Sequence, residues 1–191
     1  MKLENIVKRS RSYRRFYEDY KIENKFLKDL INLARISPSA ANLQPLKYLI
    51  SCKSSVNDRI FPALEWAGYL KGWPGPEKGE RPSAYIVILG DTGISKSFQY
   101  DAGIAGQSIL LGAAAKSLGG CLIGSIDREL LRKNLSVPEQ YEIILVVALG
   151  KPREKIVIDD VKEGNIKYFR DKKDIHHVPK RSLDEIIIRR G

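Results

Sequence analysis

Residues that commonly carry chemistry are scarce in this chain. Its 191 residues include two cysteines, two histidines and one methionine. Cys52 and Cys121 form no C-x-x-C pair, so the sequence predicts neither a disulfide framework nor a zinc cluster. His176 and His177 are adjacent and would point to opposite faces of a strand, which argues against a shared metal ion. We therefore expect no metal site and a reducing compartment.

Long apolar runs are also missing. No run reaches the ~18 residues that a membrane span requires, and the N-terminal segment is charged where a signal peptide would be apolar. We expect a cytoplasmic protein that does not enter a membrane. At 191 residues, one domain over residues 1–191 is expected.

Three common site motifs are absent as well. The chain has no G-x-x-x-x-G-K-[ST] loop and no G-x-S-x-G elbow, and "GGCLIGS" precedes a predicted strand instead of joining a strand to a helix. A P-loop, a hydrolytic triad and a Rossmann fingerprint are therefore not predicted. So little acid–base machinery is typical of proteins in which a cofactor carries the chemistry.

Basic residues, in contrast, are abundant. Lys and Arg number 33 against 23 Asp and Glu, a net charge of +10, which predicts an anionic ligand or partner. The excess is concentrated in "KRSRSYRRF", residues 8–16. On charge alone, an arm that binds nucleic acid, a solvated face and a small phosphate site all stay open.

Apolar periodicity predicts alternating helices and strands. A helix is expected over residues 21–36, with Asn24 as its cap and Pro38 beyond its end. The further expectations are helices at the start of 55–82, at 101–120 and at 127–135, and strands at 47–52, 84–90, 121–126 and 142–150. This order indicates a covered sheet of four or more strands in one layered domain.

The predicted helix at 101–120 is apolar on all sides, which is typical of a buried helix. Gly103, Gly106 and Gly112 interrupt it, so either another helix of the chain or a second subunit should approach its backbone. We favour a subunit interface. Gly119 and Gly120 are expected to end the helix.

Two connecting segments invite a functional interpretation. "SPSAANLQP", residues 37–45, crowds proline, serine and amide side chains between a helix and a strand. Residues 66–82 carry Trp66, Tyr69 and Trp73 into a loop, where they would either anchor the core or form a wall over a ligand.

Four segments, in order, resemble the nitroreductase-like flavoproteins that bind FMN. They are "RSYRRF" at 11–16, "ARISPSAANLQP" at 34–45, "DAGIAGQSILLGAAAKSLGGCLIGS" at 101–125 and "VALGKPRE" at 147–154. The resemblance implies a three-layer α+β fold with a central, mostly antiparallel sheet, and an intertwined homodimer. Residues from about 155 to 191 would form an extension that wraps the partner subunit. The middle segment is shorter than the helical excursion of larger members.

The resemblance also assigns FMN ligands. Arg11 and Ser12 would hold the phosphate and ribityl chain, and Arg14 would lie near the pyrimidine edge. The loop of one subunit, through Pro38, Ser39, Ala40 and Asn42, would contact the flavin held mainly by the other. Ile123 and Gly124 would present a backbone N–H toward flavin N5, and Lys180 and Arg181 would bind phosphate. Tyr69 and Trp73 are our candidates for the substrate wall.

The function implied by this resemblance is an FMN-dependent oxidoreductase. NAD(P)H would deliver hydride to FMN N5 in a ping-pong course, and a small planar acceptor such as a nitroaromatic or quinone would then collect it. Alternatives within flavin chemistry are a relative that spends reduced FMN on oxygen or fragments the flavin, and a flavin-storing protein without turnover. From another class, a basic nucleic-acid-binding module stays open.

Overall fold

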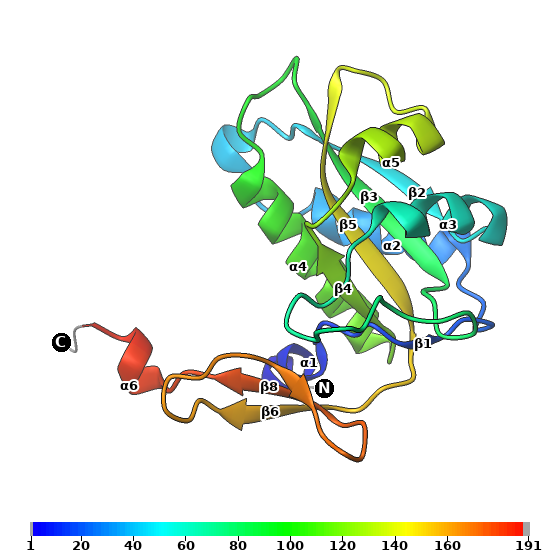
Figure 1. Cartoon of the computed structure of the whole chain (residues 1–191). Helices are drawn as coiled ribbons and strands as arrows, with labels where there is room; N and C mark the ends of the chain where they lie inside the picture. The colour runs from blue at the N-terminus through cyan, green and yellow to red at the C-terminus, as the bar shows by residue number, and fades with distance from the viewer. Residues whose placement is uncertain (1, 189–191) are drawn as a thin grey trace.

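An antiparallel sheet forms the middle of the molecule, of which the computed structural model describes residues 2–188 (Figure 1). Within those residues the sheet has five strands: β1 (Phe16–Tyr17), β2 (Leu46–Ser51), β3 (Ala84–Asp91), β4 (Gly119–Ile123) and β5 (Tyr141–Pro152). The order is β1-β5-β3-β2, and β4 also pairs with β5. Each of these pairings is antiparallel. The expected α+β class with an antiparallel central sheet is confirmed.

Side chains alternate along β3 and bury both faces of the sheet. Ile86 and Ile88 pack in the same cluster as residues of α2 (Asn24–Arg35) and α4 (Gln99–Ala115). Tyr85 and Val87 belong to the opposite cluster, with residues of α3 (Ser54–Ile60) and α5 (Arg128–Leu135). This alternation follows from the period of two in a strand, and it produces the three layers.

Helix caps agree only in part with the sequence. Asp127 caps α5, where its Oδ1 accepts a hydrogen bond from the Leu130 N–H at 2.9 Å. In α2 the capping position is Glu23, which makes no side-chain capping bond, so the prediction that Asn24 caps the helix was wrong.

The glycines of the 101–120 region have other partners than expected. A Cβ on Gly106 would meet Leu122, and one on Gly112 would meet Leu33 of α2, so neighbours within the chain account for both. Gly120 does not end the helix but lies in β4, where a Cβ would be 2.5 Å from the backbone oxygen of Ala148. Only glycine fits there.

One face of α4 is nevertheless uncovered. Tyr100 is 79% exposed and Ile104 is 39% exposed, and a Cβ on Gly103 would have no neighbour within 4 Å among residues 2–188. A single chain therefore does not bury this helix on all sides, and burial of the remaining face by a second subunit stays a prediction.

A second, smaller sheet follows the first. It consists of β6 (Ile156–Asp160), β7 (Phe169–Arg170) and β8 (His176–Lys180), and α6 (Leu183–Ile186) comes after it. Figure 1 shows that this sheet projects from the main body beside α1 (Leu3–Arg9). The short helices η1 (Ala40–Asn42) and η2 (Phe61–Ala63) complete the elements. The last three residues of the predicted extension, 189–191, lie outside the described residues.

Candidate functional site

The basic N-terminal segment lies along strand β4. Ser12 pairs with Gly120 in a parallel bridge, and the Tyr13 N–H donates to the Gly120 carbonyl at 3.0 Å. This pairing places Ser12 and Arg14 beside the strand that leads to Ile123 and Gly124.

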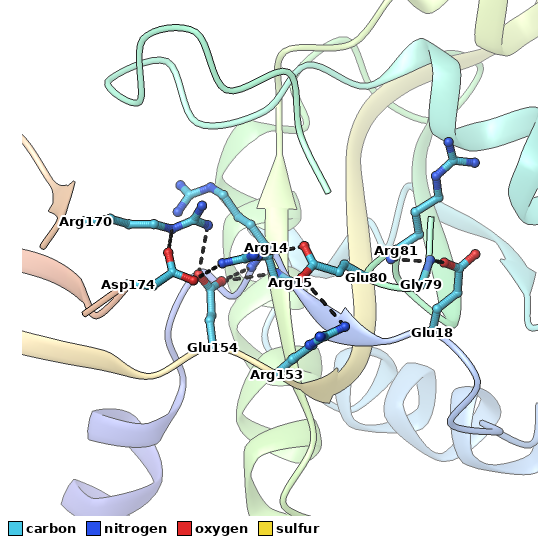
Figure 2. Close-up of polar contacts among 10 residues, drawn as sticks. All are labelled: Arg14, Arg15, Glu18, Gly79, Glu80, Arg81, Arg153, Glu154, Arg170 and Asp174. Carbon is cyan, nitrogen blue, oxygen red and sulfur yellow. Dashed lines mark hydrogen bonds and ion pairs between the residues drawn. The ribbon is translucent and has the colours of Figure 1, made fainter. Parts of the chain in front are cut away.

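A buried carboxylate fixes this segment (Figure 2). The Glu154 side chain is 2% exposed, and it accepts hydrogen bonds from the backbone N–H groups of Arg14 and Arg15. It also pairs with Arg170 Nη2 at 3.1 Å. One acid thus ties the N-terminal segment to the small sheet.

Arg15 is held by acids in the same region. Its Nε pairs with Glu80 at 2.7 Å and its Nη1 pairs with Asp174. The Arg14 guanidinium lies 4.8 Å from the centre of the Tyr168 ring. Because acids and aromatic rings within the chain engage these arginines, the segment differs from a solvated arm that would bind nucleic acid.

A cationic cavity of about 370 Å³ opens between the N-terminal segment, α4, β4 and β8. We call it the N-terminal cavity. The described residues that line it are Ser10, Arg11, Ser12, Arg14, Gln107, Leu110, Leu122, Tyr168, His176, Val178 and Lys180, with no carboxylate among them.

Arg11 supports an anionic ligand in this cavity. Its Nη2 donates to the Val7 carbonyl at 2.8 Å, whereas its buried Nε has no hydrogen-bond partner within residues 2–188. Burial lowers the pKa of the Arg11 guanidinium. A desolvated cation with an unpaired donor, beside the Ser12 hydroxyl, fits the phosphate and polyol of FMN.

A second hollow, of about 170 Å³, adjoins the first. Arg14, Leu122 and Tyr168 line both, so we treat the second as a continuation and call it the β4 hollow. Ile123 and Gly124 form part of its wall. The other lining residues are Glu65, Trp66, Ala67, Gly68, Cys121 and Ser125. Burial raises the pKa of the Cys121 thiol, which argues against a reactive thiolate.

The 37–45 loop lies at the other end of α4. Ser39 Oγ donates to Asp101 at 3.0 Å, and the Ala40 N–H donates to the same carboxylate at 2.8 Å. Pro38 and Ser39 line a hollow of about 290 Å³ that shares no residue with the N-terminal cavity. Asp101 and Gln107, the nearest residue of α4 that lines the cavity, are six residues apart, about 9 Å along the helix axis. A single chain therefore does not bring this loop to Arg11–Arg14.

This loop has an unusual backbone. Ala41, Asn42 and Gln44 have φ values of 48°, 54° and 52°, in the left-handed region. Such conformations are costly for residues other than glycine and cluster at ligand sites. Asn42 is exposed, and its side-chain oxygen accepts from Gln44 Nε2 at 3.2 Å.

The two predicted substrate residues line neither the N-terminal cavity nor the β4 hollow. The Tyr69 ring lies 4.9 Å from the Tyr168 ring, and Trp73 lies under the Arg170 guanidinium at 4.4 Å. Both therefore support the small sheet. Arg181 pairs with Glu185 at 3.2 Å and does not line the cavity, in contrast to Lys180.

Sequence reasoning missed three residues of the site. Glu154 stood inside the "VALGKPRE" segment, but nothing there revealed its partners. Tyr168 sits in a charged stretch with no periodicity. For His176 a signal existed, because neighbouring residues on a strand face opposite sides.

Within residues 2–188, no group of three or more His, Cys, Asp or Glu side chains could hold a metal ion. Across the same residues, no helix combines the length and the apolar character that a membrane crossing needs.

Comparison with known proteins gives consistent results. The model of the family described as "Nitroreductase family" matches residues 7–151. A protein of Archaeoglobus fulgidus, provisionally named an NADH dehydrogenase/NAD(P)H nitroreductase, is 27% identical over 150 residues, which cover 74% of this chain and 80% of that protein.

Solved structures share the fold. A nitroreductase family protein from Streptococcus pneumoniae has a TM-score of 0.72 at 16% identity, covering 99% of this chain and 100% of that one. A nitroreductase described as FMN-dependent, from Clostridium difficile R20291, has a TM-score of 0.65 at 22% identity, covering 80% of this chain and 88% of that one.

Proposed function

The chain belongs to the nitroreductase family, and from this membership we propose that it is an FMN-dependent oxidoreductase. It would take hydride from NAD(P)H and pass it to a small planar acceptor, such as a nitroaromatic or a quinone, in a ping-pong course. The observation that carries the proposal is the N-terminal cavity, which joins three cations to the β4 hollow. FMN, when bound, supplies the atom that accepts and donates hydride.

Different residues of the cavity would bind different parts of FMN. Arg11, Ser12 and Lys180 would bind the phosphate and the ribityl hydroxyls, and Arg181 would add positive charge near them. Arg14 would stabilise negative charge on the reduced ring, because a fixed cation in a partly buried site acts strongly at short range. Ile123 and Gly124, in the β4 hollow, would offer backbone polar groups to the ring.

The proposal includes a homodimer in which the partner subunit completes the site. Pro38, Ser39, Ala40 and Asn42 of one chain would contact the flavin of the other. Two observations support this arrangement: the loop lines a hollow separate from the N-terminal cavity, and one face of α4 is uncovered.

The names of the relatives support the proposed electron donor and acceptor. The Archaeoglobus protein is named for NAD(P)H, and we extend that donor to this chain. The same name includes nitroreductase, and we extend that class of acceptor to this chain.

An absorbance spectrum tests the proposal. The purified protein, reconstituted with FMN, should show flavin bands that bleach when NADH or NADPH is added without oxygen, and that return when a quinone is added. A protein that fails to retain FMN would overturn the assignment of the cavity. A protein that retains FMN but is not bleached would be a flavin carrier instead.

A further inference from the structure

Strand β8 presents alternate residues to the N-terminal cavity. His176, Val178 and Lys180 line it, whereas His177 and Pro179 line a different hollow on the far side of the small sheet. Lys180 is four residues from His176, about 13 Å along the strand. The strand therefore offers the cavity a histidine at one end and a cation at the other.

The His176 ring lies at the end nearest Arg14. It is 1% exposed, and its ring centre is 5.3 Å from that of Tyr168. Neither Nδ1 nor Nε2 has a hydrogen-bond partner among the described residues. Because a buried polar group without a partner is costly, such a group in a ligand cavity indicates that the ligand supplies the missing bond.

The surroundings keep this ring uncharged. Burial, together with the nearby positive charges of Arg14 and Arg170, lowers the pKa of His176 to about 4. A neutral imidazole carries one donor and one acceptor, so it suits a hydroxyl or a carbonyl group, whereas cations such as Lys180 suit a phosphate.

We propose that His176 binds the uncharged polar groups of the flavin, a ribityl hydroxyl or a ring carbonyl, at the Arg14 end of the cavity. This inference rests on the proposed function, because it takes FMN as the ligand. It assigns His176 to the part that FMN shares with riboflavin, and Lys180 to the phosphate that only FMN carries.

His177 provides a matched control on the same strand. Its Nδ1 lies 2.6 Å from Asp159 and its Nε2 lies 3.4 Å from Asp171, so both nitrogens already have partners. It faces away from the cavity.

Titration of the apoprotein with FMN and with riboflavin, followed by quenching of flavin fluorescence, tests the inference. His176→Leu should weaken the binding of both flavins by the same factor, about five- to tenfold. His176→Asn, which keeps a donor and an acceptor, should recover part of that loss. Lys180→Met should weaken FMN alone, and His177→Asn should change neither.

Several results would overturn the inference. Unchanged affinity in His176→Leu would mean that the ring only packs against Tyr168, and a loss confined to FMN would mean that His176 serves the phosphate. Should the leucine variant fail to fold, His176→Phe keeps an aromatic ring at the position and replaces it in the comparison. If wild-type protein binds neither flavin, the proposed function itself fails, which is a different outcome.

Discussion

At the scale of single residues, Glu154 organises the site without lining it. It is nearly inaccessible to solvent, yet it satisfies two backbone N–H groups of the N-terminal segment and one guanidinium of the small sheet. A buried acid in such a position fixes the direction in which Arg14 leaves the backbone. Glu154 therefore affects the ligand only indirectly, through the position of Arg14.

Replacement of Glu154 by alanine should be costly. The change leaves Arg170 with only the more exposed Asp174, 3.8 Å away, and removal of one member of a buried pair typically costs about 3–5 kcal/mol. Urea unfolding would measure the free energy of unfolding. Glu139→Ala is the control. The Glu139 side chain is 93% exposed and lies 4.0 Å from Arg132, so its removal should lower the free energy of unfolding by less than about 1 kcal/mol. Equal stability of the two variants would contradict the role of Glu154.

The adjacent histidines should give opposite pH dependences. The folded pKa of His176, about 4, is below its ordinary value of 6.5, so the unfolded chain binds more protons between those values. His176 therefore reduces stability as the pH falls from 6.5 toward 4. Hydrogen bonding to Asp159 raises the pKa of His177, so its contribution is present below 6.5 and is lost as the pH rises through the folded pKa.

Unfolding at several pH values can separate these two effects. His176→Leu should lose less stability than wild type between pH 6.5 and pH 4.5, which lie within the range set by the His176 shift. His177→Asn should instead reduce the dependence above 6.5. If His176→Leu matched wild type across the acid range, His176 would not be a buried neutral group.

At the scale of helices and strands, the sequence predicted the main sheet well and the small sheet not at all. β3 and β5 are continuous apolar runs, which identify buried strands. β6 (IVIDD) and β8 (HHVPK) are five residues long each, and neither shows the alternation of apolar and polar residues that identifies a strand. Their stability comes from pairings and ion pairs with distant parts of the chain, such as Arg170 with Glu154, and these leave no local pattern.

The site was predictable to the extent that its residues lie in compact motifs. Arg11, Ser12, Arg14 and Lys180 do meet in one cavity. Tyr69 and Trp73 were selected for being aromatic in a loop, but the contacts that decide their position come from residues about a hundred positions later, as with Tyr69 and Tyr168. Composition alone cannot show such long-range packing.

Two glycines allow the packing of the elements to be tested. Gly120→Ala would place a Cβ 2.5 Å from a backbone oxygen of β5, which cannot move without disturbing the sheet. We expect a loss of about 1–3 kcal/mol in unfolding free energy, and weaker FMN binding because Ser12 pairs with Gly120.

Gly112→Ala is the comparison. Its Cβ would meet the ends of the Leu33 and Leu30 side chains, which can rotate, and alanine gains up to about 1 kcal/mol of helix propensity. Its net change should therefore be smaller than that of Gly120→Ala. The reverse order would show that the β4–β5 pairing tolerates a side chain at this point.

At the scale of the whole molecule, the proposed homodimer accounts for features that a single chain leaves without a partner. Tyr100 and Ile104 are exposed on the apolar helix α4. The 37–45 loop has a strained backbone conformation, and the hollow that it lines contains none of the cations of the N-terminal cavity. In the proposed homodimer, a second copy would bury Tyr100 and Ile104, and its flavin would lie against the 37–45 loop.

A charge on the uncovered face of α4 should separate the subunits. Ile104→Asp would introduce an unpaired carboxylate into the proposed interface, so light scattering should show a monomer where wild type shows a dimer. FMN affinity should fall at the same time, because the partner's loop is lost. Ile94→Asp, at a position with similar exposure (42% against 39%), is the control and should remain dimeric. A dimer that persists in Ile104→Asp would place the interface elsewhere.

The attachment of the small sheet has a thermodynamic consequence. His176 and Lys180 of β8 line the cavity, as does Tyr168 directly before β7, so the sheet must be docked for the cavity to be complete. Linkage is reciprocal: if docking of the small sheet raises the affinity for FMN by some factor, binding of FMN must favour docking of the sheet by the same factor. Resistance of residues 155–188 to limited proteolysis should therefore rise with FMN concentration, in proportion to occupancy. The tail of this protein would thus report whether its cofactor is in place.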